Sequence, residues 1–480
     1  MSASAAAAQT SDSQSSDPSN PLAVSVQAQD TALKADAALD GGVSSLTTGL
    51  KLGVEADPRV AVDPLAPVNA TASKESVGFN AGWAPASAAH VDLVVGDSLS
   101  QSWTPMSLLT TANHQVTSDD QSARLALTVS PLPAIDLSLS GAAAHDAVRD
   151  SVVADALAPP APSLFATDSQ SATAGVKWRA ASWLTFDAKG QVDQASAEWR
   201  GAGVDGNAAI ADTRLDYADF APSVSTVVTL PWQDHLNLSV EHAVTPISAQ
   251  TFSTYAAVED RDPDARLGPG REWRYRLSVD QTVGDLIKLN AAVTEAQIES
   301  TTELGPVAEG LQAPVSTPGG QRQEMDLSFS APLPSFGLPA VTLQGQGAWR
   351  DSEVRDPFTG EYRRASSESP MDATLGVVQS LPDHRTRWGL EGRFGGDQAV
   401  YQMSQVTMIH VADSVGGFVE YQPGPFALRL QVDGLYGGDR DATDVIFADP
   451  RSPLPFDPID RVAYRSDSGQ AIRLILRRSL

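Results

Sequence analysis

The sequence predicts an all-β fold, an up-and-down antiparallel transmembrane β-barrel of about 18 strands within a range of about 16–22. Three observations support this fold class. Apolar and polar residues alternate with a period of two along most of the chain, short turns recur at regular intervals, and the stretches between the resulting hairpins are long and polar. Closure of the sheet is expected because lipid offers no water to the unpaired backbone groups of an open edge.

The alternation is clear at residues 184–193, where Leu184, Phe186 and Val192 are separated by polar residues such as Asp187 and Gln191. Successive side chains of a strand point to opposite faces, so this run is an amphipathic strand. Charges on the polar face argue against a dry sandwich core and favour a wet lumen. Comparable runs occur at residues 135–140, 341–349 and 426–433.

The alternation also predicts which way side chains face. One set is expected to face outward, toward lipid: Leu137, Phe186, Leu238, Leu343 and Leu430. Their polar neighbours are expected to face the lumen: Asp136, Asp187, Asn237, Gln344 and Gln431.

Short turns, several of them rich in Pro, Gly or Asp, are predicted about 48 residues apart on average. They lie near Pro85, Pro133, Ala181, Gln233, Asp285, Ser335, Asp383 and Gly424. Polar stretches that we interpret as long loops lie between the hairpins, at residues 146–170, 201–219, 257–270 and 437–464. Up-and-down winding should place all the short turns, and the C-terminus, at one rim.

Tryptophans favour a membrane-spanning barrel, because aromatic side chains form girdles at both membrane interfaces. Five lie close to a predicted short turn: Trp83, Trp178, Trp183, Trp232 and Trp388. Trp199 and Trp349 lie toward the opposite strand ends.

Composition excludes several classes of protein. The 480 residues include 33 Lys and Arg against 59 Asp and Glu, a formal net charge of −26. A nucleic-acid partner is therefore not expected, because it requires a basic stripe. There is no cysteine, which removes disulfide scaffolds and thiolate chemistry. No apolar run approaches the roughly 18 residues of a transmembrane helix.

Two regions are expected along the chain. Residues 1–40 are rich in Ser and Ala and are predicted to be a disordered N-terminal segment, whereas residues 41–480 form the barrel. A signal peptide is not visible, because no basic stretch precedes an apolar core near the start.

Four stretches of the C-terminal third resemble the barrel end of TonB-dependent outer-membrane receptors of Gram-negative bacteria. They are residues 349–360, 388–391, 418–423 and 428–435. The resemblance implies a location in the outer membrane, with short periplasmic turns and long external loops. It also implies uptake of a nutrient or iron chelate, with lipopolysaccharide, the barrel-assembly machinery and a TonB-type energy-transducing protein as partners.

The sequence departs from this family in two respects. Barrels of these transporters have about 22 strands and a plugged lumen, whereas about 18 strands are expected here and residues 1–75 do not resemble a plug domain. The barrel should therefore be narrower than those of the family, or left open between its first and last strands. A plug-less pore for passive diffusion, a non-transporting barrel fragment and a secreted β-rich adhesin remain alternatives.

No enzyme activity, metal site or cofactor is predicted. Two acidic groups lie in expected loops, Asp260, Asp262 and Asp264, and Asp439, Asp441 and Asp444, but the first lacks the Gly and Glu of a calcium loop. The histidines His90, His145, His235, His242 and His384 are spread over different hairpins. Lumen-facing charges are expected at Lys189, Lys288, Arg393 and Arg429, beside Asp187, Glu391 and Asp433.

Overall fold

The computed structural model describes residues 7–10, 30–33, 45–58, 71–86, 89–107, 110–153, 163–202, 210–231, 234–256 and most of 258–478. Within that last range the description leaves out residues 259–261, 263, 285, 334–337, 339, 425, 439, 448–450, 452–457 and 467–470. No helix in this described part is both long and apolar enough to cross a membrane.

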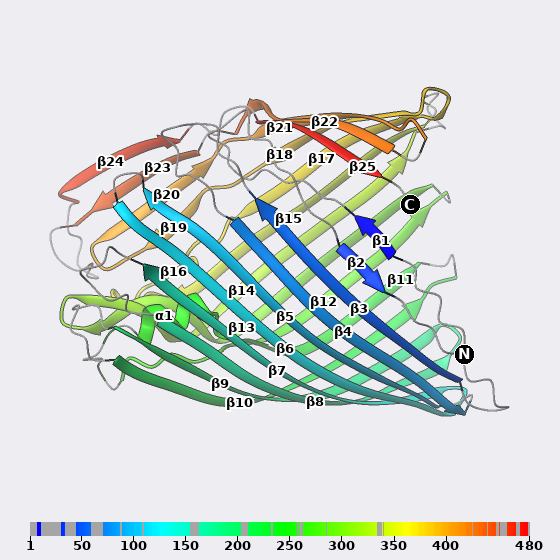
Figure 1. The fold of residues 1–480 in the computed structure, drawn as a ribbon, viewed down its shortest axis with the longest axis horizontal. Helices are drawn as coiled ribbons and strands as arrows, with labels where there is room; N and C mark the ends of the chain where they lie inside the picture. The colour runs from blue at the N-terminus through cyan, green and yellow to red at the C-terminus, as the bar shows by residue number, and fades with distance from the viewer. Residues whose placement is uncertain are drawn as a thin grey trace.

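The described chain forms one large antiparallel barrel (Figure 1). Its wall consists of β3 (Ser45–Pro58), β4 (Thr71–Ala86), β5 (Ala89–Ser107), β6 (Thr110–Leu132), β7 (Ile135–Val153), β8 (Ser163–Ala181), β9 (Leu184–Ala202), β10 (Ile210–Thr229), β11 (His235–Thr245), β12 (Gly270–Val283), β13 (Ile287–Ala308), β14 (Leu311–Pro332), β15 (Val341–Arg355), β16 (Tyr362–Arg363), β17 (Met371–Leu381), β18 (Thr386–Phe394), β21 (Ser414–Tyr421), β22 (Phe426–Gly437) and β25 (Ala471–Arg478). The strand order places β25 beside β3 and so closes the sheet.

The strand number agrees with the prediction. The closed order has nineteen members in the described part, and β16 is a two-residue strand that pairs with the end of β15. About 18 strands therefore form the wall, fewer than the roughly 22 of plugged outer-membrane transporters. Of the two forms expected from the sequence, a narrower barrel or an open sheet, the strand order corresponds to the narrower barrel.

The short turns lie at one rim, as predicted. Hairpins turn at residues 86–89, 132–135, 181–184, 229–235, 283–287, 332–341, 381–386 and 421–426. The turn at 381–386 includes the 3-10 helix η2 (Pro382–His384). Arg478, at the end of β25, pairs with Phe426 at the start of β22, so the last strand ends at this rim. We call it the turn rim and the opposite one the loop rim.

The strands extend further toward the loop rim than the sequence predicts. Residues 146–153 and 163–170, expected in a loop, belong to β7 and β8, which pair as far as Asp150 and Ser163. Residues 210–219 likewise belong to β10. Both faces of a strand contact water where it extends beyond the membrane, so its sequence no longer alternates between apolar and polar residues. The sequence of these strand ends therefore resembles that of loops.

A small second sheet lies at the loop rim and was not predicted. It has the order β19 (Gln398–Tyr401), β20 (Gln405–Val411), β23 (Arg440–Ile446) and β24 (Asp460–Ser466). Its strands come from the connections β18–β21 and β22–β25, the latter expected to be a loop. Figure 1 shows this sheet at the same end of the barrel as α1 (Ala249–Ala256).

The N-terminal region is described only in part. Within residues 1–40, β1 (Ala7–Thr10) and β2 (Asp30–Leu33) pair as a two-stranded antiparallel sheet. The remainder of the predicted disordered segment lies outside the described residues. The boundary near residue 41 stays a prediction, and the first strand of the wall begins at Ser45.

Candidate functional site: the barrel lumen

The outer face of the barrel carries an apolar belt. Side chains directly opposite one another on five neighbouring strands are all exposed on the isolated chain: Leu238 on β11, Leu277 on β12, Val293 on β13, Met325 on β14 and Trp349 on β15. Exposed apolar rows of this kind face lipid in transmembrane barrels. Among the residues expected to face outward, Leu137, Leu238 and Leu430 are exposed large apolar side chains.

The opposite face of the same strands is polar. In register, Asn237 lies opposite Ser278, Gln344 opposite Ser330, and Asp187 opposite Ser225. These residues alternate with the apolar belt, so they line the lumen, as predicted. The barrel therefore has an apolar outer surface and a polar lumen.

A band of paired charges lines the lumen on β12 to β17. It consists of Glu272, Arg274, Arg276, Arg322, Glu324, Asp326, Arg350 and Asp372. Arg276 Nη1 lies 3.0 Å from Asp326 Oδ2, and Arg322 Nη2 lies 2.7 Å from Glu272 Oε1. Arg350 contacts Glu324 at 3.1 Å and Asp372 at 2.6 Å. Each arginine of this charged band thus has a carboxylate partner, and the band is close to neutral.

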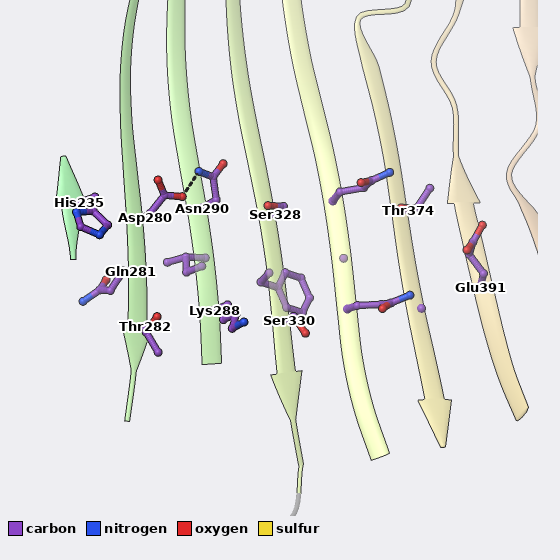
Figure 2. A pocket seen from close by; sticks show the side chains of 16 residues that line it. His235, Asp280, Gln281, Thr282, Lys288, Asn290, Ser328, Ser330, Thr374 and Glu391 are labelled. Atoms are coloured by element: carbon purple, nitrogen blue, oxygen red, sulfur yellow. Dashed lines mark hydrogen bonds between the residues drawn. The ribbon is translucent and has the colours of Figure 1, made fainter. Parts of the chain in front are cut away.

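Between the charged band and the turn rim, the same strands line a pocket of about 610 Å³ (Figure 2). Its wall is made mostly of hydroxyl and carboxamide side chains, and we call it the neutral lumen pocket. The polar lumen-facing residues are His235, Asp280, Thr282, Lys288, Asn290, Ser328, Ser330, Gln344, Gln346, Thr374 and Glu391.

Two rows of the pocket follow from strand register. One row places Asn290 opposite Ser328, and continues through Gln346 to Thr374. The second row runs from Lys288 through Ser330, Gln344 and Gly376 to Glu391. Neighbouring strands lie about 4.8 Å apart, so each row offers polar groups at this spacing around the wall.

Most of the lumen charges predicted from the sequence pair along or across strands. Lys189 lies 3.4 Å from Asp187, and Arg393 lies 2.9 Å from Glu391. Asp433 pairs instead with Arg473 at 3.2 Å. Arg429 lies over the ring of Phe418, 3.8 Å from its centroid. Such pairs favour a structural role, whereas Lys288 lines the neutral lumen pocket.

The connection between β11 and β12 folds inward at the loop rim. Its helix α1 contacts β8, β9 and β14, which lie on two parts of the wall separated by four strands. Phe252 of α1 is fully buried, and its ring lies 5.8 Å from that of Phe165 on β8. Leu267 and Trp199 complete this apolar contact. The helix therefore narrows the lumen on its loop side. The expectation that Trp199 belongs to an aromatic girdle at the membrane interface is wrong, because its side chain is buried against α1.

A buried ion cluster joins the connections at the loop rim. Asp356 accepts hydrogen bonds from Arg363 Nε and Arg451 Nη1, both at 2.7 Å, and Arg363 Nη2 lies 3.0 Å from Glu303. The guanidinium of Arg363 also lies 3.9 Å from the ring centroid of Tyr401. Burial acts to raise the pKa of Asp356, but the hydrogen bonds from Arg451 and Arg363 outweigh it and lower that pKa below 3.8. We call Glu303, Asp356, Arg363 and Arg451 the loop-rim ion cluster.

The acidic groups singled out in the sequence serve local structure in the described residues. The backbone N–H of Asp264 donates to Asp262 Oδ1 at 2.9 Å. Asp444 accepts from Thr407 at 2.7 Å, and Asp441 lies 3.9 Å from Arg465. The other two members, Asp260 and Asp439, lie outside the described residues.

The histidines lie far apart, as the sequence suggested. His90 pairs with Asp92 at 2.9 Å, and His145 with Asp168 at 2.7 Å. His242 Nε2 lies 3.3 Å from Glu299 Oε2, which accepts from it. His235 contacts Thr229 at 3.2 Å, and His384 lies in η2 at the turn rim. Within the described residues, no group of three or more His, Asp or Glu is placed to hold a metal ion.

Sequence reasoning missed the loop-rim ion cluster and the neutral lumen pocket. The cluster pairs Asp356 with Arg451, 95 positions apart, which no local spacing reveals. The pocket has a weak sequence signal, a run of amides and hydroxyls at alternate positions that includes Gln344 and Gln346.

Comparison with known proteins supports the fold. A scan of protein-family models and a search of curated proteins gave no match. Among solved structures, the unliganded ferric citrate transporter FecA aligns with a TM-score of 0.70 at 11% identity, over 98% of this chain and 72% of that one. The copper transporter OprC aligns with a TM-score of 0.66 at 12% identity, over 96% and 76%.

The ferric yersiniabactin uptake receptor FyuA from Yersinia pestis also aligns, with a TM-score of 0.66 at 11% identity, over 95% of this chain and 71% of that one. These proteins are transporters and receptors rather than enzymes. At such low identities the likeness shows the fold alone. The chain therefore has the fold of the TonB-dependent outer-membrane receptor barrels that its sequence resembles.

Proposed function

We propose that this protein is an outer-membrane transport protein that passes solutes through the lumen of its barrel, as the receptors it resembles do. One observation carries the proposal: the same strands present an exposed apolar row outside, from Leu238 to Trp349, and a polar wall inside. A soluble barrel would bury its apolar face, because exposed apolar area of this extent is unfavourable in water.

The proposal includes a location in the outer membrane, with the turn rim facing the periplasm and the loop rim outside. Long strands at the loop rim, the small second sheet and the inward-folded α1 support this orientation, because outer-membrane barrels have short periplasmic turns and larger external connections. Lipopolysaccharide and the barrel-assembly machinery would then be partners.

Two modes of transport are compatible with this site. Energised uptake would need a TonB-type partner, as in the family that the sequence resembles. Passive diffusion is favoured by the neutral lumen pocket, whose polar groups face an accessible cavity of about 610 Å³.

The experiment is to fold the full chain into liposomes and planar bilayers. A folded barrel should migrate differently on gels before and after heating. Steady conductance without any partner would support passive diffusion, whereas a folded, non-conducting barrel that restores energy-dependent uptake in cells would support the receptor mode. Aggregated protein that neither folds in lipid nor conducts would contradict the proposal.

A further inference from the structure

The neutral lumen pocket differs from the charged band in how its polar groups are satisfied. Within the described part of the chain, no hydrogen bond joins Gln344, Gln346, Ser328, Ser330 or Thr374 to another side chain. In the charged band, by contrast, each arginine is paired. The free polar groups of this wall are therefore directed to whatever occupies the lumen.

Figure 2 shows how these groups are placed. Asn290 and Ser328 lie side by side on β13 and β14, and Asn290 donates to Asp280 at 2.5 Å. Thr374 and Glu391 continue the wall on β17 and β18. The polar side chains thus come from seven consecutive strands, β11 to β18, if the short β16 is set aside.

The chemistry of the wall favours an uncharged ligand. A carboxamide offers both donors and an acceptor, and a hydroxyl both donates and accepts, so the pocket matches groups that also do both. An anionic chelate would require several unpaired cations. Lys288 is the single basic side chain of the pocket besides His235, and two acidic side chains, Asp280 and Glu391, offset it, so the pocket has no excess of cations for an anion.

The wall of the neutral lumen pocket also leaves open space beside the Gln344 carboxamide. A Cβ added at Gly376 would lie 3.5 Å from Gln344 Cγ and 3.5 Å from its Nε2, so glycine leaves space next to this carboxamide. A smaller cavity of about 160 Å³ shares Gln344, Gly376 and Glu391 and continues around the wall past Phe418 on β21 to Gln431 and Asp433 on β22. The site is therefore elongated along the wall rather than a single spherical hole.

We propose that the neutral lumen pocket binds uncharged polyhydroxylated solutes, and specifically short oligosaccharides. This inference rests on the proposed transport function and names the substrate class of that lumen. A chain of sugar hydroxyls would exchange hydrogen bonds with Asn290, Ser328, Gln346 and Thr374 in one row and with Ser330 and Gln344 in the other.

The test measures binding directly, by isothermal titration of the full-length barrel folded in detergent. The probes are three uncharged hexasaccharides built from glucose or mannose units (maltohexaose, cellohexaose and mannohexaose), with citrate as the anionic comparison. We expect at least one hexasaccharide to bind and citrate to bind more weakly. Absence of binding by all three hexasaccharides, or tighter binding of citrate, would overturn the inference.

Variants locate the site. Gln344→Leu and Gln346→Leu keep side-chain size but remove the carboxamides, and each should weaken binding by about 3- to 10-fold, the loss of one neutral hydrogen bond. Gly376→Ala should weaken binding by narrowing the space beside Gln344. The matched control is Gln191→Leu, an equivalent lumen-facing amide on β9 that is bonded to Asp193. Equal losses in Gln191→Leu and Gln344→Leu would contradict the assignment to this pocket.

The outcome separates this inference from the proposed function. If the barrel conducts or supports energy-dependent uptake but binds no hexasaccharide, the proposed transport function is supported and the oligosaccharide inference is contradicted. Binding that depends on Gln344 in a barrel that neither conducts nor supports uptake would support the pocket and contradict transport.

Discussion

Arg451 and Asp356 lie 95 positions apart in the chain and are joined by a buried ion pair, with Nη1 2.7 Å from Oδ2. Arg451 belongs to the connection between β22 and β25, and Asp356 follows β15. The Arg451 side chain is 9% exposed and that of Asp356 is 2% exposed. Asp356 also binds Arg363, which lies in the same connection as Asp356 and contacts Glu303 on β13. One carboxylate therefore links the β15–β17 connection, the β22–β25 connection and, through Arg363, strand β13.

Removal of this carboxylate should open the loop rim. Asp356→Asn leaves the buried guanidinium of Arg451 against a neutral amide, while Arg363 keeps Glu303. Breaking a buried pair in this way costs about 3–5 kcal/mol. We expect faster cleavage by trypsin at the loop rim, measured by limited proteolysis of the folded barrel. The control is Asp351→Asn, which breaks a pair with Arg364 in which the carboxylate is 78% exposed and should change little. Equal cleavage rates in the two variants would contradict a locking role for Asp356.

The loop-rim ion cluster should withstand mild acid. The pKa of Asp356 is lowered below 3.8, so its stabilising contribution is fully present above that ordinary value and is lost only as pH falls through the lower folded value. Protection factors for backbone hydrogen exchange of residues 356–363 should therefore be equal at pH 7 and pH 5, and should fall only below about pH 4. Loss of protection already between pH 7 and pH 5 would show that another group controls the cluster.

His410 on β20 should titrate above the ordinary histidine value. A hydrogen bond with Asp397 at 2.6 Å is the main cause of its raised pKa, and the charge of Asp441 adds to it. The pair of protonated His410 with Asp397 stabilises the small second sheet below pH 6.5. This stabilisation is lost as pH rises through the raised pKa of His410. NMR titration should give a pKa above 6.5 that falls in Asp397→Asn and falls less in Asp441→Asn. A larger effect of Asp441→Asn would contradict this order of causes.

Adjacent residues on β14 should respond oppositely to a charge. Leu327 is 42% exposed on the outer face, whereas Ser328 lines the neutral lumen pocket. Leu327→Arg places a cation against lipid, at a cost of about 2–4 kcal/mol near the bilayer midplane, while Ser328→Arg places it in water. The folded fraction in liposomes, read from heat-modifiable migration, should fall for Leu327→Arg alone. A comparable loss for Ser328→Arg would contradict the assignment of the two faces.

The helix α1 should depend on one aromatic contact. Phe252 is fully buried against Phe165 and Trp199, and truncating a buried Phe costs about 3–5 kcal/mol. Phe252→Ala should release α1 from the wall and raise both its protease sensitivity and any bilayer conductance. The control is Leu338→Ala, because the Leu338 side chain is half-exposed and lies at the turn rim, away from α1. Unchanged proteolysis of α1 in Phe252→Ala would mean that the surrounding polar contacts hold the helix without this ring.

The sequence by itself determined the faces, the turns and the strand number. Side chains alternate along any strand, so Leu238 and Asn237 were assigned to opposite faces without knowledge of their neighbours. Turn residues such as Asp383 and Gly424 likewise act locally. The sequence underestimated how far the strands extend beyond the membrane. Around Asp150 both faces of the strand carry polar residues, so no apolar alternation reveals the strand there.

Only the tertiary structure decided the content of the lumen and the loop rim. The neutral lumen pocket arises because strand register brings Asn290, Ser328, Gln346 and Thr374 into one row, and register depends on pairing between strands rather than on any one of them. The pair of Arg451 with Asp356 likewise depends on how two distant connections fold over the barrel. Such long-range contacts leave no periodic signal in the chain. Their partners depend on strand register and on the folding of distant connections, not on the spacing of residues in the sequence.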